Sequence, residues 1–261
     1  MPNWVCNHLI IHGENATEIM RSLLIKNENS DCNYDLDFNK IIPMPEDLNI
    51  ISGSTTNDCA KLFINAMLEG CDAYAKYAGL YTKAFGKNFY MSETEQAETM
   101  KNALRYKDHE TDELLFKTKA DVYAYGKRAL DNYAKYGAKD WYEWSIQNWG
   151  TKWNACNTQI NDMNEPNIYF DTAWSPPLPV INELSKKYPD LTFEFAFAEE
   201  QAGISTGDMV VQNGEIIKGG FFDDDSKEAY ETFFELWGME DEFRFNEKTG
   251  TYEYIDNEEA M

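Results

Sequence analysis

Basic residues are scarce in this sequence. Its 261 residues include 46 aspartates and glutamates but only 23 lysines and arginines, which leaves a formal net charge of −23. This charge argues against direct binding of nucleic acid or of an anionic membrane, because both require basic patches on the protein. The charged partner that this composition favours is another protein with a basic surface.

Metal ligands are also few. His8 and His12 stand four residues apart in a predicted strand, which separates them by about 13 Å at about 3.3 Å per residue. They cannot share one metal ion, and His109 lies in a charged stretch where we expect a solvated side chain. The five cysteines form no CxxC pair, so we predict reduced thiols that mostly fill the core, no structural zinc and no cofactor. They are Cys6, Cys32, Cys59, Cys71 and Cys156.

Recognised catalytic motifs are missing from the chain. The sequence contains no GxGxxG, no phosphate-binding P-loop, no GxSxG and no HExxH. We therefore assign no catalytic residue, and a non-enzymatic role is favoured. The first residues, MPNWVCNHLIIHG, have no basic segment before a short apolar stretch, which predicts a cytoplasmic protein without a signal peptide or membrane span.

Hydrophobic periodicity divides the chain into three parts. Residues 1–56 read as a strand, a helix and an alternating second strand, YDLDFNKII, which form the N-terminal part of a sheet domain. Residues 57–147 change to helical periodicity and are rich in tyrosine, which predicts a helical insertion with capping boxes at Ser92 and Thr118. Its tyrosines fit either helix packing, which is favoured, or a sticky interaction surface.

Residues 148–261 return to β patterns and end in an acidic tail. They predict two strands joined by a proline-entered helix, then a hairpin at Asn213 and Gly214, a helix closed by Gly238 and a last hairpin. The predicted fold class is α+β: an antiparallel sheet with helices on one face and a large helical insertion.

Four tryptophans cluster between residues 141 and 153. The spacings Trp141 to Trp144 and Trp149 to Trp153 would place each pair on one helix face, and burial in the core is the favoured interpretation. Exposure as an interface hot spot is the alternative. The neighbouring polar residues and Trp174 suggest a possible pocket. Its candidate residues are Trp149, Thr151, Lys152, Trp153, Asn154 and Trp174.

Several blocks of the sequence together resemble the YubB-like family of phage and plasmid proteins. They are MPNWVCNHLIIHG, FNKIIPMPEDL, WYEWSIQNWGTKWNA and FDTAWSPPLPVINELSKKYPDLTFEFAF. The resemblance implies a ferredoxin-like C-terminal part, carriage on a mobile element and a location in the cytoplasm of a bacterial host. It implies no reaction and no catalytic residue.

Charge distribution suggests a function. Residues 190–261 hold twenty acidic and four basic residues, so this stretch carries a large share of the negative charge. We expect a non-enzymatic phage or plasmid protein whose acidic surface mimics DNA and binds the basic nucleic-acid-binding surface of a host protein. A host defence protein is such a partner, which would make this an anti-CRISPR or anti-restriction inhibitor. The candidate partner-binding residues are Glu199, Glu200, Asp223, Asp224 and Asp225.

A second class of function stays open. The chain could instead be a small-molecule-binding protein, or an enzyme without a recognised motif, that uses a pocket beside the NWGTKW stretch. Lys152 is the basic group of that stretch and would anchor an anionic ligand there.

Overall fold

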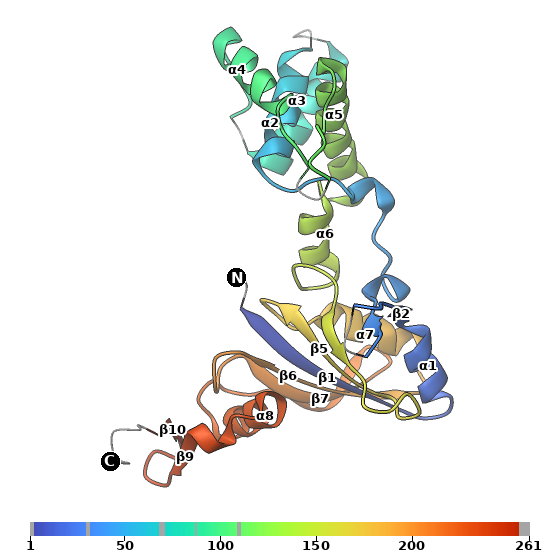
Figure 1. The fold of residues 1–261 in the computed structure, drawn as a ribbon, viewed down its shortest axis with the longest axis vertical. Coiled ribbons are helices and arrows are strands. Elements are labelled where there is room, and N and C mark those ends of the chain that lie inside the picture. The colour runs from blue at the N-terminus through green and yellow to red at the C-terminus, as the bar shows by residue number, and fades with distance from the viewer. Residues whose placement is uncertain (1–2, 30–31, 68–70, 87, 109–110, 256–261) are drawn as a thin grey trace. The chain divides into compact units, whose positions relative to one another are not determined.

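The computed structural model describes residues 3–255 except 30–31, 68–70, 87 and 109–110, so His109 lies outside the described residues (Figure 1). The chain divides into two compact units. The sheet unit comprises residues 1–43 and 145–261, and the helical unit comprises residues 44–144. No helix in the described part of the chain is both long and apolar enough to cross a membrane.

The sheet unit is built from short strands and a few helices. Before the helical unit the chain forms β1 (Trp4–His12), α1 (Ala16–Ser22), β2 (Leu24–Lys26), β3 (Tyr34–Leu36) and a 3-10 turn (Phe38–Lys40). After it come β4 (Cys156–Gln159), β5 (Asn167–Ala173), α7 (Leu178–Lys187), β6 (Thr192–Glu199), β7 (Thr206–Gln212), β8 (Glu215–Phe221), α8 (Lys227–Trp237), a 3-10 turn (Glu240–Glu242), β9 (Phe243–Asn246) and β10 (Thr251–Tyr254).

The main sheet has six antiparallel strands in the order β4-β5-β1-β6-β7-β8. β5 and β6 therefore run parallel to each other on either side of β1, and α7 makes the crossover between them. Alternate residues such as Leu9, Phe195 and Met209 are buried and lie beside one another across β1, β6 and β7. The predicted α+β class with an antiparallel sheet is confirmed.

Helices cover both faces of this sheet. α1 and α7 lie on one side and α8 lies on the other (Figure 1). α8 is anchored by the Trp237 indole, which donates to the Ala198 carbonyl, and by the Cys6 thiol, which donates to the Leu236 carbonyl. Cys6 and Ala198 point away from the face that carries Leu9 and Phe195, since side chains alternate along a strand. The expectation of helices on one face alone missed α8.

The second strand of the N-terminal part is shorter than its pattern predicts. β3 pairs with β2 in a separate two-stranded sheet and does not join the main sheet. The chain turns after Leu36 because the Asp37 carboxylate accepts hydrogen bonds from the backbone and side-chain amides of Asn39. These local hydrogen bonds compete with the backbone hydrogen bonds between paired strands, so the strand ends here.

Local turn and cap signals in the C-terminal part are confirmed. Asn213 and Gly214 have φ angles of 47° and 80° and join β7 to β8, as a type I′ turn requires. α8 begins after Ser226, whose side chain accepts from the Ala229 amide, and ends at Gly238 with φ 69°. β9 and β10 form the predicted last hairpin.

The helical unit contains five described helical segments and the start of α6. They are a 3-10 turn (Glu46–Leu48), α2 (Ser54–Asn65), α3 (Asp72–Phe85), α4 (Glu93–Ala103) and α5 (Lys119–Tyr136), followed by α6 (Trp141–Asn148), which contains the boundary between the units. The capping boxes at Ser92 and Thr118 are both present. α2 and α5 pack closely, since a Cβ on Gly126 of α5 would collide with the backbone of Cys59 and Ala60.

The tyrosines of the helical unit divide between core and surface. Tyr77 and Tyr81 are buried in one hydrophobic cluster, whereas Tyr90 is 76% exposed. Tyr77 and Tyr81 both lie on α3. Packing therefore explains the two buried rings.

Candidate functional site

The helix α6 ends just before the NWGTKW stretch reaches Trp149. α6 ends at Asn148, and the amides of Trp149 and Gly150 both donate to the Ser145 carbonyl. Gly150 has a φ of 78°, which residues with a side chain rarely adopt. A Cβ at this position would also collide with the Pro179 ring. Trp149 and Trp153 therefore do not share a helix face, which corrects the expectation from their spacing.

Trp149 is a core residue. It is 4% exposed, and its indole donates to the Ile42 carbonyl at 2.9 Å while its ring meets the edge of Phe38. Trp144 is buried as well. Burial, the favoured interpretation of the tryptophan cluster, holds for these two residues.

Two other pocket candidates hold the backbone of the sheet unit in place. The Thr151 hydroxyl is buried and donates to the Ala173 carbonyl at 2.8 Å. The Asn154 side chain accepts from the Phe38 amide at 2.8 Å and donates to the Asp37 carboxylate at 2.8 Å. Their polar atoms are used inside the fold, so neither residue presents a binding group to a pocket.

The remaining pocket candidates, Lys152, Trp153 and Trp174, form a cluster with Trp4 that we call the tryptophan clamp. The Lys152 ammonium lies 4.5 Å from the ring centroid of Trp153 and 4.7 Å from that of Trp174. Trp4 lies beside Trp153 with ring centroids 6.1 Å apart. The rings of Trp153 and Trp174 attract the Lys152 ammonium through their negative π faces. This cation–π contact holds the two rings in place.

Trp174 is held in a conformation that large residues avoid. Its φ is 75°, and its side chain is 44% exposed at the end of β5. A left-handed backbone costs an L-residue with a side chain about 1–2 kcal/mol. The strain persists because the Trp174 amide donates to the Asn3 carbonyl and the Ser175 hydroxyl donates to the Gly150 carbonyl. Strain of this kind is concentrated at functional positions.

Two of the predicted acidic residues lie at the same end of the sheet as this clamp. β1 begins at Trp4 where β5 and β6 end, so Trp4 pairs with Ala173. The Glu199 carboxylate accepts from the Asn3 side chain at 2.6 Å, and the Glu200 carboxylate accepts from the Trp4 amide at 3.1 Å. Acidic and aromatic candidates therefore meet around the start of β1.

The other three acidic candidates connect to this end through the loop after β6. The Asp224 carboxylate accepts from the Ser205 amide at 3.1 Å, and the Asp225 amide donates to the Gly203 carbonyl at 2.8 Å. Asp223, Asp224 and Asp225 are all exposed. We call the clamp and the five carboxylates together the sheet-end surface. None of these carboxylates forms an ion pair within the described part of the chain.

Thiols near β1 and β5 are poorly suited to nucleophilic chemistry. Cys6 and Cys156 both pair with Asp171 across neighbouring strands. Burial, followed by the charge of Asp171, raises the pKa of Cys6 to about 12 and that of Cys156 to about 11. Burial also raises the pKa of the Asp171 carboxyl above its ordinary value. A reactive cysteine needs a lowered pKa, so these thiols stay protonated at neutral pH.

A thiol titration checks this environment. Of the five cysteines, Cys59 alone is fully buried and Cys71 is exposed, so the expectation that most of them fill the core was wrong. At pH 8 we expect a disulfide reagent to modify Cys71 fastest, and Cys6, Cys59 and Cys156 only after unfolding, because their raised pKa values keep the thiolate fraction low. Cys71→Ser should remove the fast phase, and a fast phase that survives this change would contradict the assignment.

Comparisons with known proteins concern the C-terminal part of the sheet unit. A search of curated proteins gives no match. A solved structure, protein Api92 from Yersinia pseudotuberculosis, is 15% identical, with a TM-score of 0.36, and the match covers 85% of this chain and 99% of that chain. Residues 148–240 match the family model described as the ferredoxin-like domain in Api92-like protein. The predicted ferredoxin-like fold class is thereby confirmed, and this part of the chain is similar to the corresponding domain of Api92-like proteins.

Proposed function

We propose that this protein binds a partner protein with a basic surface, and that the sheet-end surface makes the contact. The observation that carries the proposal is the convergence of an ordered tryptophan clamp and five unpaired carboxylates at one end of one sheet. Exposed tryptophans are enriched among interface hot spots. Carboxylates around them supply complementary charge for a basic partner.

Charge distribution over the two units supports this location. The sheet unit has thirty acidic and ten basic residues, whereas the helical unit has sixteen and thirteen. Long-range attraction of a basic partner therefore acts mainly on the sheet unit. Four of the acidic residues of the sheet unit, Asp31, Asp256, Glu258 and Glu259, lie outside the described residues.

The partner class follows from the same chemistry. A protein that binds nucleic acid presents lysine and arginine side chains in a groove shaped for phosphates, and carboxylates can take the place of those phosphates. We propose a bacterial nucleic-acid-handling protein as the partner, with the present chain acting as an accessory protein of a phage or plasmid that inhibits a host defence system.

Charge neutralisation tests the proposal. Several of the five carboxylates accept internal hydrogen bonds, so glutamine and asparagine are the suitable replacements because they keep an acceptor. The test variant combines Glu199→Gln, Glu200→Gln, Asp223→Asn, Asp224→Asn and Asp225→Asn. A matched control neutralises five exposed carboxylates of the helical unit, namely Glu46, Asp72, Glu93, Glu98 and Glu113.

The measurement has two steps. Bacterial proteins captured by the unmodified chain are identified, and the association rate of the purified partner is then measured for each variant. We expect the test variant to associate at least about tenfold more slowly at low salt, since steering depends on the local field. The control variant should keep most of the rate. Equal rates for the two variants would contradict the proposed surface.

A further inference from the structure

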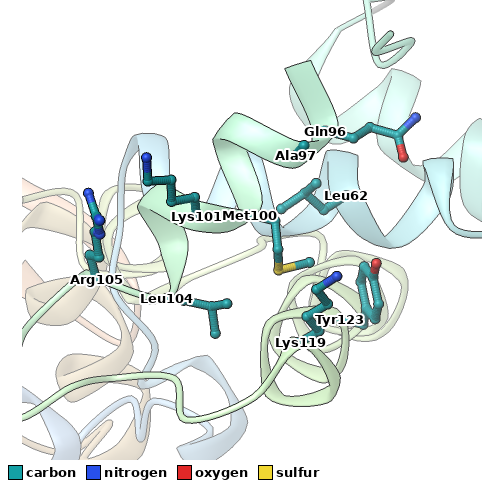
Figure 2. A pocket seen from close by; sticks show the side chains of 9 residues that line it. All are labelled: Leu62, Gln96, Ala97, Met100, Lys101, Leu104, Arg105, Lys119 and Tyr123. Atoms are coloured by element: carbon teal, nitrogen blue, oxygen red, sulfur yellow. The ribbon is translucent and has the colours of Figure 1, made fainter. Parts of the chain in front are cut away.

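A second feature, in the helical unit, lies outside the proposed contact surface. A pocket of about 450 Å³ opens between α4 and α5, with α2 behind it (Figure 2). Its size lies within the range of small-molecule sites, which is about 300–1,000 Å³. The lining residues are Leu62, Gln96, Ala97, Met100, Lys101, Leu104, Arg105, Lys119 and Tyr123.

The floor of this pocket is apolar. Leu62 and Met100 are buried members of a hydrophobic cluster, and Leu104 and Tyr123 pack against that cluster while remaining half-buried. Figure 2 shows the Leu62 and Met100 side chains lying between the helices. An apolar group that entered the pocket would therefore extend the core of the helical unit and remove the exposed parts of Leu104 and Tyr123 from water.

The rim of the pocket is cationic. Lys101, Arg105 and Lys119 are exposed, and no carboxylate is among the lining residues. None of the three cations forms an ion pair with a residue that the structure describes. The chain has twice as many acidic as basic residues, so three cations around one pocket give this region a more positive charge than the average surface of the protein.

The position of Lys119 adds to the positive potential. It is the first residue of α5, directly after the Thr118 cap. The amino end of a helix carries a partial positive charge that adds to the charge of Lys119, and the one acidic residue of this first turn, Asp121, forms the capping box with Thr118. Lys101 lies in the last turn of α4, where a cation is favourable.

We propose that this pocket binds a small organic anion with an apolar body. A carboxylate, sulfonate or phosphate group would lie among Lys101, Arg105 and Lys119, and the apolar part would lie on Leu62, Met100 and Leu104. The proposal is independent of the sheet-end surface, because every lining residue belongs to the helical unit.

Anilinonaphthalene sulfonate is a suitable probe because it joins a sulfonate to an aromatic body and fluoresces when it is bound in an apolar site. With the folded full-length protein we expect saturable binding of one dye molecule. Decanoate should displace the dye, whereas decyltrimethylammonium, with the same chain and the opposite charge, should not. Absence of saturable binding, or equal displacement by the two competitors, would overturn the proposal.

Two variants locate the dye. Arg105→Ala with Lys119→Ala should weaken binding about tenfold, since charge-assisted contacts at an exposed rim contribute modestly. Lys76→Ala with Lys83→Ala, an equal change of charge on α3, should leave binding unchanged. Ala97→Trp fills the pocket from an exposed lining position and should abolish binding while every cation remains. Dye affinity that is the same in all these variants would place the dye elsewhere.

Discussion

Gly126→Ala should lower the free energy of unfolding of the helical unit by about 3 kcal/mol, at the upper end of typical overpacking costs. An added Cβ would collide with the carbonyl of Cys59 and would lie 2.7 Å from the amide nitrogen of Ala60. Both atoms belong to the backbone of α2, so no side-chain rotation relieves the contact. The separation of α2 and α5 would have to increase, which would loosen the two clusters that contain Leu62 and Leu130.

Gly79→Ala on α3 is the matched control. No atom lies within 4 Å of a Cβ built there, and the residue is exposed in a helix. Alanine should therefore stabilise the unit by about 0.5–1 kcal/mol through helix propensity alone. Urea denaturation followed by circular dichroism measures both changes. If the two variants changed stability in the same direction, the close packing of α2 on α5 would be wrong.

Trp174→Ala is expected to weaken binding of the basic partner at least about 30-fold, because truncation of a hot-spot residue costs about 2 kcal/mol or more. The change removes an exposed ring and one of the two rings that cover the Lys152 ammonium. Tyr90→Ala, which removes a side chain that is 76% exposed in the helical unit, should leave the affinity unchanged.

Trp174→Gly separates binding from stability. Glycine accepts the φ of 75° without strain, so this variant should be more stable than Trp174→Ala by about 1 kcal/mol. Both variants lack the ring and should bind the partner equally weakly. Thermal unfolding and titration calorimetry give the two quantities. Full affinity in either variant would show that the ring is not part of the contact.

Local signals in the sequence predicted local structure well. The capping boxes at Ser92 and Thr118 and the turn at Asn213 each depend on atoms a few residues apart, so short patterns contain all the information needed. Phe193, Phe195 and Phe197 alternate along the sequence as a half-buried strand requires, and all three side chains are buried in β6. Periodicity failed for YDLDFNKII, where the Asp37 side chain ends the strand.

The candidate site depended on contacts that no short pattern contains. Residue types drew attention to Lys152, Trp153 and Trp174, but their spacing did not show that both rings cover one ammonium. Glu199 meets Asn3 only because β1 lies between β5 and β6. Trp4 is far from the other clamp residues in the sequence, and the pairing of β1 with β5 places it beside them.

The most direct test of the central claim is photo-crosslinking from the sheet-end surface. Gln201 is exposed in the loop that joins Glu200 to Ser205, so a benzoylphenylalanine at position 201 would lie beside the carboxylates without replacing one. The same residue at position 90 in the helical unit is the control. We predict that position 201 crosslinks the basic partner at about 0.1 M salt and loses it at about 1 M, where the Debye length falls from about 10 Å to about 3 Å. A partner captured at position 90 alone, or a crosslink from position 201 that salt does not weaken, would contradict the account.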